Sequence, residues 1–335
     1  MLAVNTIREG AMRILVTGGA GYIGSCVAWF LKEQGHEVIV FDSLRTGHRD
    51  AVAEEFIRGD LVNKNEIHAA LAKYLPEAVF HFAACSIVPE SVTNPSLYYS
   101  NNLLGGLNLL EVMRTLNINY LVFSSTAAVY GLPEQALIGE DHPKNPLSPY
   151  GDTKLCIERM IQSYAAAYGL RFALLRYFNA AGAIPEADLG ERHIPETHLV
   201  PIILQVAGGK RPSLDIYGRD YQTPDGTCIR DFIHIRDLAE AHLASLLHLA
   251  HSPTNLELNL GTGIGHSVLE VIACAERITN QSIACNNLPR RSGDPPVLVA
   301  SPQLAKQALN WTPSSSSLDE IIHSAWRFYQ KHISC

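Results

Sequence analysis

A tyrosine and a lysine four residues apart are the first side chains whose spacing suggests chemistry. In Ser148-Pro149-Tyr150-Gly151-Asp152-Thr153-Lys154, a serine suited to an N-cap precedes a proline suited to the first turn, which predicts a helix. Tyr150 and Lys154 then lie one turn apart on the same helical face. A free tyrosine has a pKa of about 10, so a tyrosine base at pH 7 needs that pKa lowered by about 3 units, or about 4 kcal/mol. A positive charge nearby supplies such help.

A hydroxyl triplet is expected to meet this helix. Ser124-Ser125-Thr126 follows the apolar run Tyr120-Leu121-Val122-Phe123, which predicts a strand whose carboxyl end carries the hydroxyls. Doubly wound folds bind their ligands at this end of the sheet. A Tyr-x-x-x-Lys spacing alone is common on helices, but a hydroxyl at Thr126 can bridge a substrate hydroxyl and Tyr150.

A glycine motif predicts a dinucleotide site. Thr17-Gly18-Gly19-Ala20-Gly21-Tyr22-Ile23-Gly24 lies between an apolar strand and an amphipathic helix, where glycines let a pyrophosphate approach the helix N-terminus. Asp42 ends the next predicted strand, 18 residues beyond Gly24. An acid there accepts hydrogen bonds from the ribose hydroxyls and repels a 2′-phosphate, which favours NAD over NADP although Arg45 is near. Asp60 and Leu61 are expected to reach the adenine, with Asp60 as a helix cap being the alternative.

The elements that position these residues alternate along the first half of the chain. Strands are predicted at 13–17, 37–42, 78–82, 120–124 and 172–176, with helices between them, as at 23–34. Continuous apolar strands alternating with helices indicate an α/β fold, a doubly wound parallel sheet covered on both faces. The predicted division is a tail at 1–11, a cofactor domain at 12–180 and a smaller substrate lobe at 181–335. Segments at about 230–260, including a helix at 237–249, are expected to return to the cofactor domain.

Composition excludes several classes of protein. Hydrophobic residues make up 47% and charged residues 18% of the 335 residues, and the net charge is −7. Such a chain can build a large core, and it lacks the positive charge of a typical nucleic-acid binder. We see no stretch of about 18 apolar residues for a membrane span and no secretory signal. The seven cysteines form no Cys-x-x-Cys pair, so we expect reduced thiols, no metal site and a cytoplasmic protein.

At this point the chain resembles the extended short-chain dehydrogenase/reductases, through its glycine loop, its hydroxyl triplet and its Tyr150/Lys154 pair. More specific motifs are similar to the UDP-glucose 4-epimerase family from about residue 12 to the end. They are Asn101-Asn102, the run 123–131, Leu175-Arg176-Tyr177-Phe178-Asn179, the run 225–234, the run 259–263 and Arg290-Arg291-Ser292-Gly293-Asp294.

This resemblance implies a mechanism. Tyr150, with Thr126, would take the proton of the sugar 4′-hydroxyl, and the C4′ hydride would pass to tightly bound NAD. The 4-keto sugar would then rotate to present its other face before the hydride returns. The implied cofactor-binding residues are Gly18, Gly21, Tyr22, Ile23, Gly24, Asp42, Asp60, Leu61, Phe82, Ala83, Asn101, Ser124, Tyr150, Lys154 and Tyr177. Those implied for the UDP-sugar are Thr126, Tyr150, Phe178, Asn179, His198, Leu199, Tyr217, Arg230, Arg291, Asp294 and Leu298. Among the last, Arg230 and Arg291 would hold the diphosphate.

Rival activities are weighed by departures from the family pattern. Related dehydratases carry carboxylates directly after the hydroxyl triplet, whereas this chain has Ala127 and Ala128, which cannot transfer a proton. An NADPH-dependent reductase is disfavoured by Asp42, and a non-catalytic dinucleotide sensor has no need of Tyr150 and Lys154. Leu298 falls at the position that selects the sugar's 2′ substituent, so N-acetylhexosamines and pentoses stay open as substrates.

Two further features of the resemblance concern a cofactor contact and the assembly. Ser86 stands where some relatives carry a lysine near the cofactor, which puts that one contact in doubt. Relatives dimerise through a four-helix bundle, and segments 98–116 and 149–168 are suited to that role, so we expect a homodimer.

Overall fold

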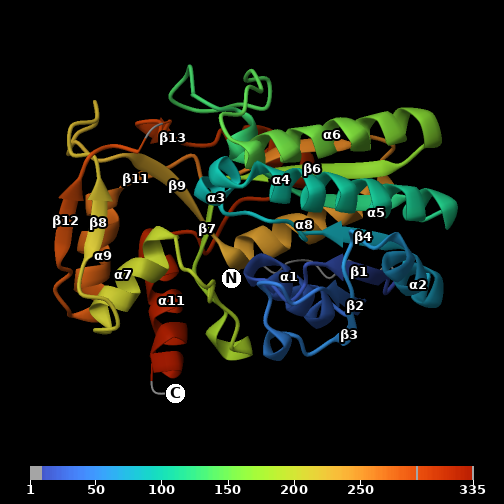
Figure 1. The fold of residues 1–335 in the computed structure, drawn as a ribbon, viewed down its shortest axis with the longest axis horizontal. Coiled ribbons are helices and arrows are strands. Elements are labelled where there is room, and N and C mark those ends of the chain that lie inside the picture. Colours follow the sequence, from blue (N-terminus) through green and yellow to red (C-terminus); the bar gives the residue numbers. More distant parts are fainter. Residues whose placement is uncertain (1–9, 292, 334–335) are drawn as a thin grey trace.

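The structure is a computed structural model that describes residues 10–291 and 293–333. In the described chain, seven strands form one parallel sheet in the order β10-β6-β5-β4-β1-β2-β3 (Figure 1). They are β1 (Arg13–Thr17), β2 (Glu37–Asp42), β3 (Glu55–Arg58), β4 (Ala78–His81), β5 (Tyr120–Thr126), β6 (Arg171–Tyr177) and β10 (Leu256–Leu260). The predicted doubly wound parallel sheet is confirmed.

Alternation along the strands sends side chains to two buried layers. Ile14 and Val16 of β1 pack with α1 and α8 on one face, whereas Leu15 packs with α2, α5 and α6 on the other. Because both faces are covered, every position of these strands favours an apolar residue. The helices around the sheet are α1 (Tyr22–Glu33), α2 (Lys64–Tyr74), α3 (Val88–Thr93), α4 (Pro95–Tyr98), α5 (Leu104–Thr115), α6 (Pro149–Tyr168) and α8 (Ile235–His251), with a π-helical turn at Tyr99–Leu103.

A smaller lobe lies beside the sheet, at the left of Figure 1. Its helices α7, α9 and α11 pack together around an apolar core of their own. Strand β9 pairs with β7, β11 and β13, and β8 pairs with β12. The elements are β7 (Asn179–Ala181), α7 (Leu199–Ala207), β8 (Leu214–Tyr217), β9 (Ile229–His234), β11 (Gly265–Ser267), α9 (Val268–Thr279), β12 (Cys285–Leu288), β13 (Val297–Leu298) and α11 (Leu318–Ile333). Helix α10 (Gln303–Leu309) instead packs on the core of the large sheet, beside β10 and α8.

The strand register gathers the chemistry at one edge of the large sheet. Thr17 at the end of β1 is opposite His81 at the end of β4, and Thr126 at the end of β5 is opposite Tyr177 at the end of β6. All these strands run in the same direction, so their carboxyl ends meet the glycine loop and the start of α6 at a single edge. The fold thus brings the predicted catalytic and cofactor-binding segments to one side of the sheet.

Candidate active site

Two glycines of the loop between β1 and α1 are required by the fold itself. Gly18 has φ of +70°, and a Cβ there would lie 2.5 Å from the backbone nitrogen of Ala83. A Cβ on Gly24 would lie 2.2 Å from the carbonyl oxygen of Gly18. Both positions therefore exclude a side chain, because the backbone segments touch.

Gly21 is different, because the protein around it leaves room for a side chain. Its φ is −81°, and an added Cβ would meet only the carbonyl oxygen of Gly18, at 3.4 Å. Helix α1 begins at the next residue with no side-chain cap and no acid in its first turn, so its positive N-terminal end faces this open space. An open helix N-terminus beside a glycine suits a pyrophosphate, so the residues here fit a bound dinucleotide.

Asp42 at the end of β2 braces the same loop. One carboxylate oxygen accepts a hydrogen bond from Ala20 N at 3.0 Å, and the other accepts one from Leu44 N at 2.7 Å. Burial raises the pKa of this carboxyl group, and the two backbone hydrogen bonds oppose that shift. The carboxylate is thus fixed in orientation beside the glycine loop, as recognition of a ribose requires.

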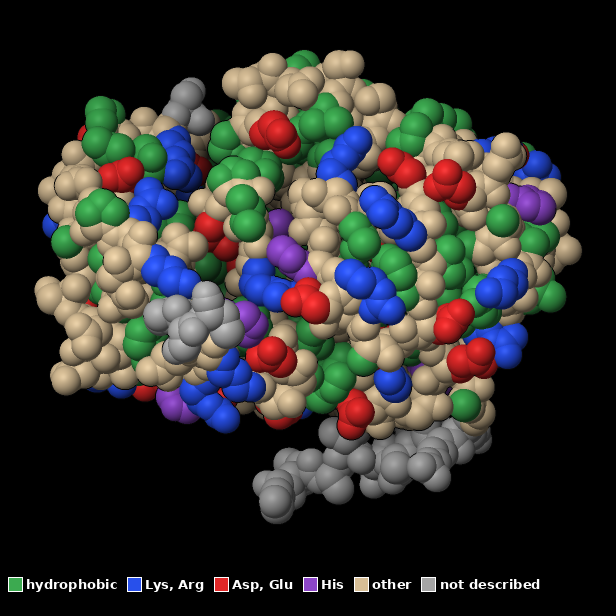
Figure 2. All heavy atoms as spheres, turned by 60° about the horizontal axis from the view of Figure 1, so that its bottom comes forward, with side chains coloured by type: hydrophobic (Ala, Val, Ile, Leu, Met, Phe, Trp, Pro, Cys, Tyr) green, Lys and Arg blue, Asp and Glu red, His purple; other side chains and the backbone are tan. Residues whose placement is uncertain are grey.

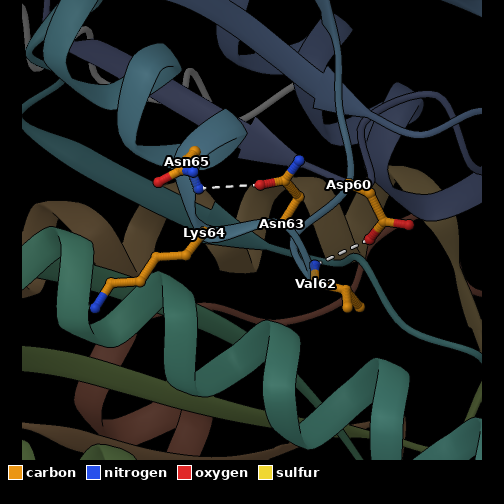
Figure 3. A pocket seen from close by; sticks show the side chains of 5 residues that line it. All are labelled: Asp60, Val62, Asn63, Lys64 and Asn65. Carbon is orange, nitrogen blue, oxygen red and sulfur yellow. Dashed lines mark hydrogen bonds between the residues drawn. The ribbon is translucent and has the colours of Figure 1, made fainter.

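Asp60 and Leu61 follow β3 at the same edge of the sheet. Asp60 accepts a hydrogen bond from Val62 N at 3.0 Å and lines an open pocket of about 430 Å³ (Figure 3). The cap of α2 is Asn63, which accepts from Asn65 N. The alternative that Asp60 caps this helix is therefore wrong, and its carboxylate stays at the rim of the pocket. Leu61 is buried in the core under α2 and α5.

Helix α6 positions the catalytic pair as the sequence predicts. The Ser148 side chain accepts a hydrogen bond from Gly151 N and caps the helix, and Pro149 occupies its first turn. Tyr150 follows directly, and the hydroxyl of Thr126 lies close enough to lower the pKa of Tyr150. Lys154, only 3% exposed, donates to the carbonyl oxygen of Ser124 at 2.7 Å. The tyrosine, the threonine and the lysine therefore converge on the end of β5.

The protonation equilibria of this pair differ from those of free side chains. Burial raises the pKa of Tyr150 to about 12, against a smaller lowering by the Thr126 hydrogen bond. Burial lowers the pKa of Lys154 to about 7, and the charge of Glu158 opposes that change. In the chain alone the tyrosine is therefore protonated at neutral pH. The lowering that catalysis requires must come from positive charge brought in with a ligand, together with a fully protonated Lys154.

Further predicted cofactor residues surround this point. Ser124 and Tyr177 are hydrogen-bonded through their hydroxyls. Phe82 and Tyr177 both pack against the buried ring of His242, at centroid distances of 5.1 and 5.8 Å. Asn101 accepts a hydrogen bond from Arg45 at 3.2 Å. Phe82 also borders Gly18, and Ser124 contacts Lys154, so these residues extend from the glycine loop to the predicted catalytic pair.

The residues predicted for the diphosphate and the nucleoside form smaller groups in the other lobe. Arg230 on β9 lies 3.5 Å from Asp294, and the guanidinium of Arg291 stacks 3.8 Å over the ring of Tyr217. Arg291 is exposed, so its guanidinium group is accessible to a ligand. Asn179 on β7 donates to the carbonyl oxygen of Asp231 at 2.9 Å.

Phe178 and Leu298 pack against one small apolar cluster that includes Tyr130. Leu298 belongs to β13, beside Arg230 of β9, so it lies next to the predicted diphosphate residue. His198 and Leu199 lie at the start of α7, where His198 contacts the carboxylates of Glu191 and Glu196 at 3.6 and 2.8 Å. The structure therefore ties His198 to acids of its own segment.

The sequence analysis missed a buried charge network under the catalytic strand. Arg176, wholly buried in β6, donates to both carboxylate oxygens of Glu158 at 2.8 Å and to Glu257 at 2.7 Å. Glu158 also accepts from the hydroxyl of Ser125 at 2.5 Å. The available signal was that Glu158 lies four residues beyond Lys154, on the same helical face.

The surface adds little to this account of the site. On the face drawn in Figure 2, Lys and Arg side chains are interspersed with Asp and Glu side chains. Of the helices in residues 10–291 and 293–333, none is both long and apolar enough to cross a membrane.

Comparison with known proteins places these residues in a family. The model of the NAD dependent epimerase/dehydratase family matches residues 14–261. A UDP-glucose 4-epimerase of Halalkalibacterium halodurans is 48% identical over 322 residues, covering 96% of each chain. The UDP-glucose 4-epimerase of Brucella ovis in complex with NAD is 47% identical with a TM-score of 0.92, covering 94% of this chain and 98% of that one.

A third relative was solved with both kinds of ligand. It is the UDP-glucose 4-epimerase of Stenotrophomonas maltophila with bound NAD and formylated UDP-arabinopyranose, 38% identical with a TM-score of 0.93, covering 96% of this chain and 98% of that one. This chain therefore belongs to the NAD-dependent epimerase/dehydratase family.

Proposed function

We infer that this protein interconverts UDP-galactose and UDP-glucose by inverting C4′ of the sugar, with NAD as a resident cofactor. The observation that carries this inference is the position of Tyr150 beside Thr126 and one helical turn from Lys154, with two alanines directly after Thr126. A base beside the C4′ hydroxyl with no second acid or base next to it suits epimerisation. It does not suit dehydration, which needs a further proton transfer at C5 and C6.

The chain's own residues divide the proton chemistry between them. Tyr150, as a phenolate, removes the proton from the 4′-hydroxyl. Thr126 forms hydrogen bonds to both the substrate hydroxyl and the phenol oxygen of Tyr150. Lys154 stabilises the phenolate and holds the nicotinamide ribose. When bound, NAD supplies the acceptor for the C4′ hydride and returns it to the other face of the sugar. The 4-keto sugar rotates to present its other face while the UDP moiety stays bound.

Anchoring of UDP is assigned to the arginines of the smaller lobe. Arg230 and Arg291 are the cations for the diphosphate, because guanidinium groups bind phosphate oxygens in a bidentate way. Asp294 lies beside Arg230 and is assigned to the uridine ribose. Asn179 is assigned to a phosphate. The uracil is assigned to Tyr217, which is stacked on Arg291, together with His198 and Leu199.

Cofactor contacts are proposed for the residues around the glycine loop. Gly21, Tyr22 and Ile23 present the N-terminal amides of α1 to the pyrophosphate, and Asp42 binds the adenosine ribose. Asp60 and Leu61 are assigned to the adenine. The nicotinamide end is assigned to Phe82, Ala83, Asn101, Ser124 and Tyr177.

The sugar that this site prefers is decided near Leu298. Leucine is of intermediate size, so UDP-N-acetylglucosamine and UDP-pentoses are the second candidates. The half-buried packing of Leu298 beside Phe178 favours a hexose without a 2′-acetamido group. A Leu298→Ser variant should gain activity on the N-acetylated sugar relative to UDP-galactose, as measured by kcat/KM on each.

We also propose a homodimer, with residues 12–180 as the cofactor domain and 181–335 as the main substrate lobe. Exposed apolar side chains occur along the helices between β4 and β6: Val92 60%, Tyr99 39%, Leu104 40%, Leu107 40% and Tyr168 57% exposed. A helical face of this kind suits pairing with a second copy. Light scattering after size-exclusion chromatography measures the assembly, and a Leu107→Glu variant should convert the dimer to a monomer.

The test of the proposed function is incubation of the purified protein with UDP-galactose, without added cofactor, followed by NMR of the sugar protons. Formation of UDP-glucose up to equilibrium, without net NADH, supports the proposal. The matched control is Tyr150→Phe, which removes one hydroxyl and should lower kcat by about 10²–10⁴-fold. A lack of turnover even with added NAD contradicts the hexose assignment. A 4-keto-6-deoxy product contradicts the exclusion of dehydration based on Ala127 and Ala128.

A further inference from the structure

A short segment before α7 gathers three side chains, of which Glu191 and His193 have no part in the proposed reaction and His198 is assigned to the uracil side of the substrate. Glu191, His193 and His198 each offer a ligand atom, and these atoms all lie within 4.8 Å of one another. The Glu191 side chain is 8% exposed, and those of His193 and His198 are 22% and 51% exposed. The spacing of these residues is two and then five, and the sequence analysis expected no metal because it considered only the spacing of the cysteines.

The ligand set favours one class of ion. Two imidazoles and one carboxylate are the donors that Zn²⁺ takes in open sites, where a fourth position remains for another ligand. Donors bound at about 2.1 Å around a tetrahedral ion lie about 3.4 Å apart. One pair in this cluster, His198 Nδ1 and Glu191 Oε2, is already 3.6 Å apart. Another pair, His193 Nδ1 and Glu191 Oε1, is in direct ion-pair contact and must open by side-chain rotation to admit an ion.

The surroundings hold these side chains in place. Glu196, 5% exposed, accepts hydrogen bonds at 2.8 Å from Thr197 N, from His198 N and from His198 Nδ1. Glu196 thus orients the His198 ring through Nδ1, the same nitrogen that lies 3.6 Å from Glu191, so a bound ion would replace this hydrogen bond. Arg192, between the candidate ligands, forms two hydrogen bonds of 2.9 Å to Asp50. The segment is therefore ordered before any ion arrives.

A small cavity adjoins the cluster. Glu191 and His193 line it together with Gly21 and Tyr22 of the cofactor loop, and its volume of about 10 Å³ is close to the space that one water or ion occupies. The ion pairs between Glu191 and the two histidines are the alternative explanation of the cluster. Ion pairing alone accounts for the proximity of the charges but does not require a small cavity beside them.

We propose that Glu191, His193 and His198 bind one divalent ion of the Zn²⁺ class, with its open position toward the cavity beside Gly21. Such an ion ties the segment before α7 to the glycine loop. The site stands on the chain's own residues and is independent of which sugar nucleotide the protein uses.

The test is a Zn²⁺ titration of the untagged protein after treatment with a chelator, in competition with a chromophoric zinc indicator. Wild type is expected to bind one equivalent, and His193→Gln and Glu191→Gln to bind it at least about tenfold more weakly. The matched control is His68→Gln, because His68 is exposed on α2, outside this cluster. Its affinity for Zn²⁺ should equal that of wild type. Circular dichroism verifies that each variant is folded.

Cobalt substitution tests the wild-type chain directly, so the proposal does not depend on the variants folding. The Co²⁺ form should show the ligand-field bands of a four-coordinate ion without thiolate-to-cobalt charge transfer, because no cysteine is in the set. Thiolate charge transfer, equal binding by His193→Gln and His68→Gln, or no binding by wild type would each overturn the proposal.

Discussion

Removing the charge of Lys154 tests how the chain activates Tyr150. Burial raises the pKa of Tyr150 to about 12 in the chain alone, so roughly one molecule in 10⁵ carries the phenolate at pH 7. Tyr150 and Lys154 are one helical turn apart, which places their Cβ atoms about 5–6 Å from each other, and we take about 6 Å as the separation of their charges. At an effective dielectric constant of about 20, two unit charges at that distance interact by about 3 kcal/mol, or about two pKa units. The positive nicotinamide ring must supply the remaining shift.

We therefore expect Lys154→Met to raise the Tyr150 pKa of the NAD-loaded protein by about two units, and to lower the turnover rate at pH 7 roughly 100-fold. The rate loss should shrink as the pH rises toward the new pKa. The assay is ultraviolet difference titration of tyrosinate, with Tyr150→Phe as the reference that isolates this residue. Lys154→Arg, which keeps the charge, is the matched control and should retain most of the lowered pKa. A tyrosinate pKa that is unchanged in Lys154→Met would refute this reasoning.

Three further predictions concern the loop, the charge network and cofactor choice. Gly21→Ala should fold with its free energy of unfolding changed by less than about 1 kcal/mol, yet it should contain less bound NAD than wild type, as measured by acid extraction. Gly24→Ala should lower the free energy of unfolding by about 1–3 kcal/mol or more, because its Cβ meets backbone. Equal thermal stability of the two variants would contradict this. Arg176→Met should cost about 3–5 kcal/mol in urea unfolding by leaving Glu158 buried and unpaired, and adding Glu158→Leu should recover part of it; a double variant less stable than the single one would argue otherwise. Asp42→Ser should strengthen NADP⁺ binding at least about tenfold by removing a negative charge near the 2′-phosphate; calorimetry measures it, and an unchanged affinity counts against the role of Asp42.

The strands and the helix caps were predictable because their signals are local. The runs at 13–17 and 37–42 match β1 and β2, and the predicted helix at 237–249 lies within α8. Continuous apolar stretches specify strands buried on both faces. Strand β3 was missed, because its sequence Glu-Phe-Ile-Arg is short and half charged. It lies at the edge of the sheet, where one neighbour is enough and the apolar requirement is weak.

Long-range contacts were less predictable from the sequence. Nothing local indicates that Arg176 in β6 reaches Glu158 in α6, since that pair depends on how the helix packs on the sheet. The segment from Glu191 to His198 likewise carries no recognisable spacing and acquires its cluster only when the loop folds back on itself. The raised pKa of Tyr150 is a further example, because burial depends on the whole fold whereas the expected help from Lys154 was read from helical spacing alone.

The most direct test of the central claim follows a labelled hydrogen through one turnover. UDP-galactose carrying deuterium at C4 of the sugar is incubated with the purified protein in ordinary water, without added cofactor, and the product is examined by NMR and mass spectrometry. The account predicts UDP-glucose that keeps its deuterium at C4, because the same hydrogen leaves and returns within the site. Protium at C4 of the product, or no UDP-glucose at all, would contradict it.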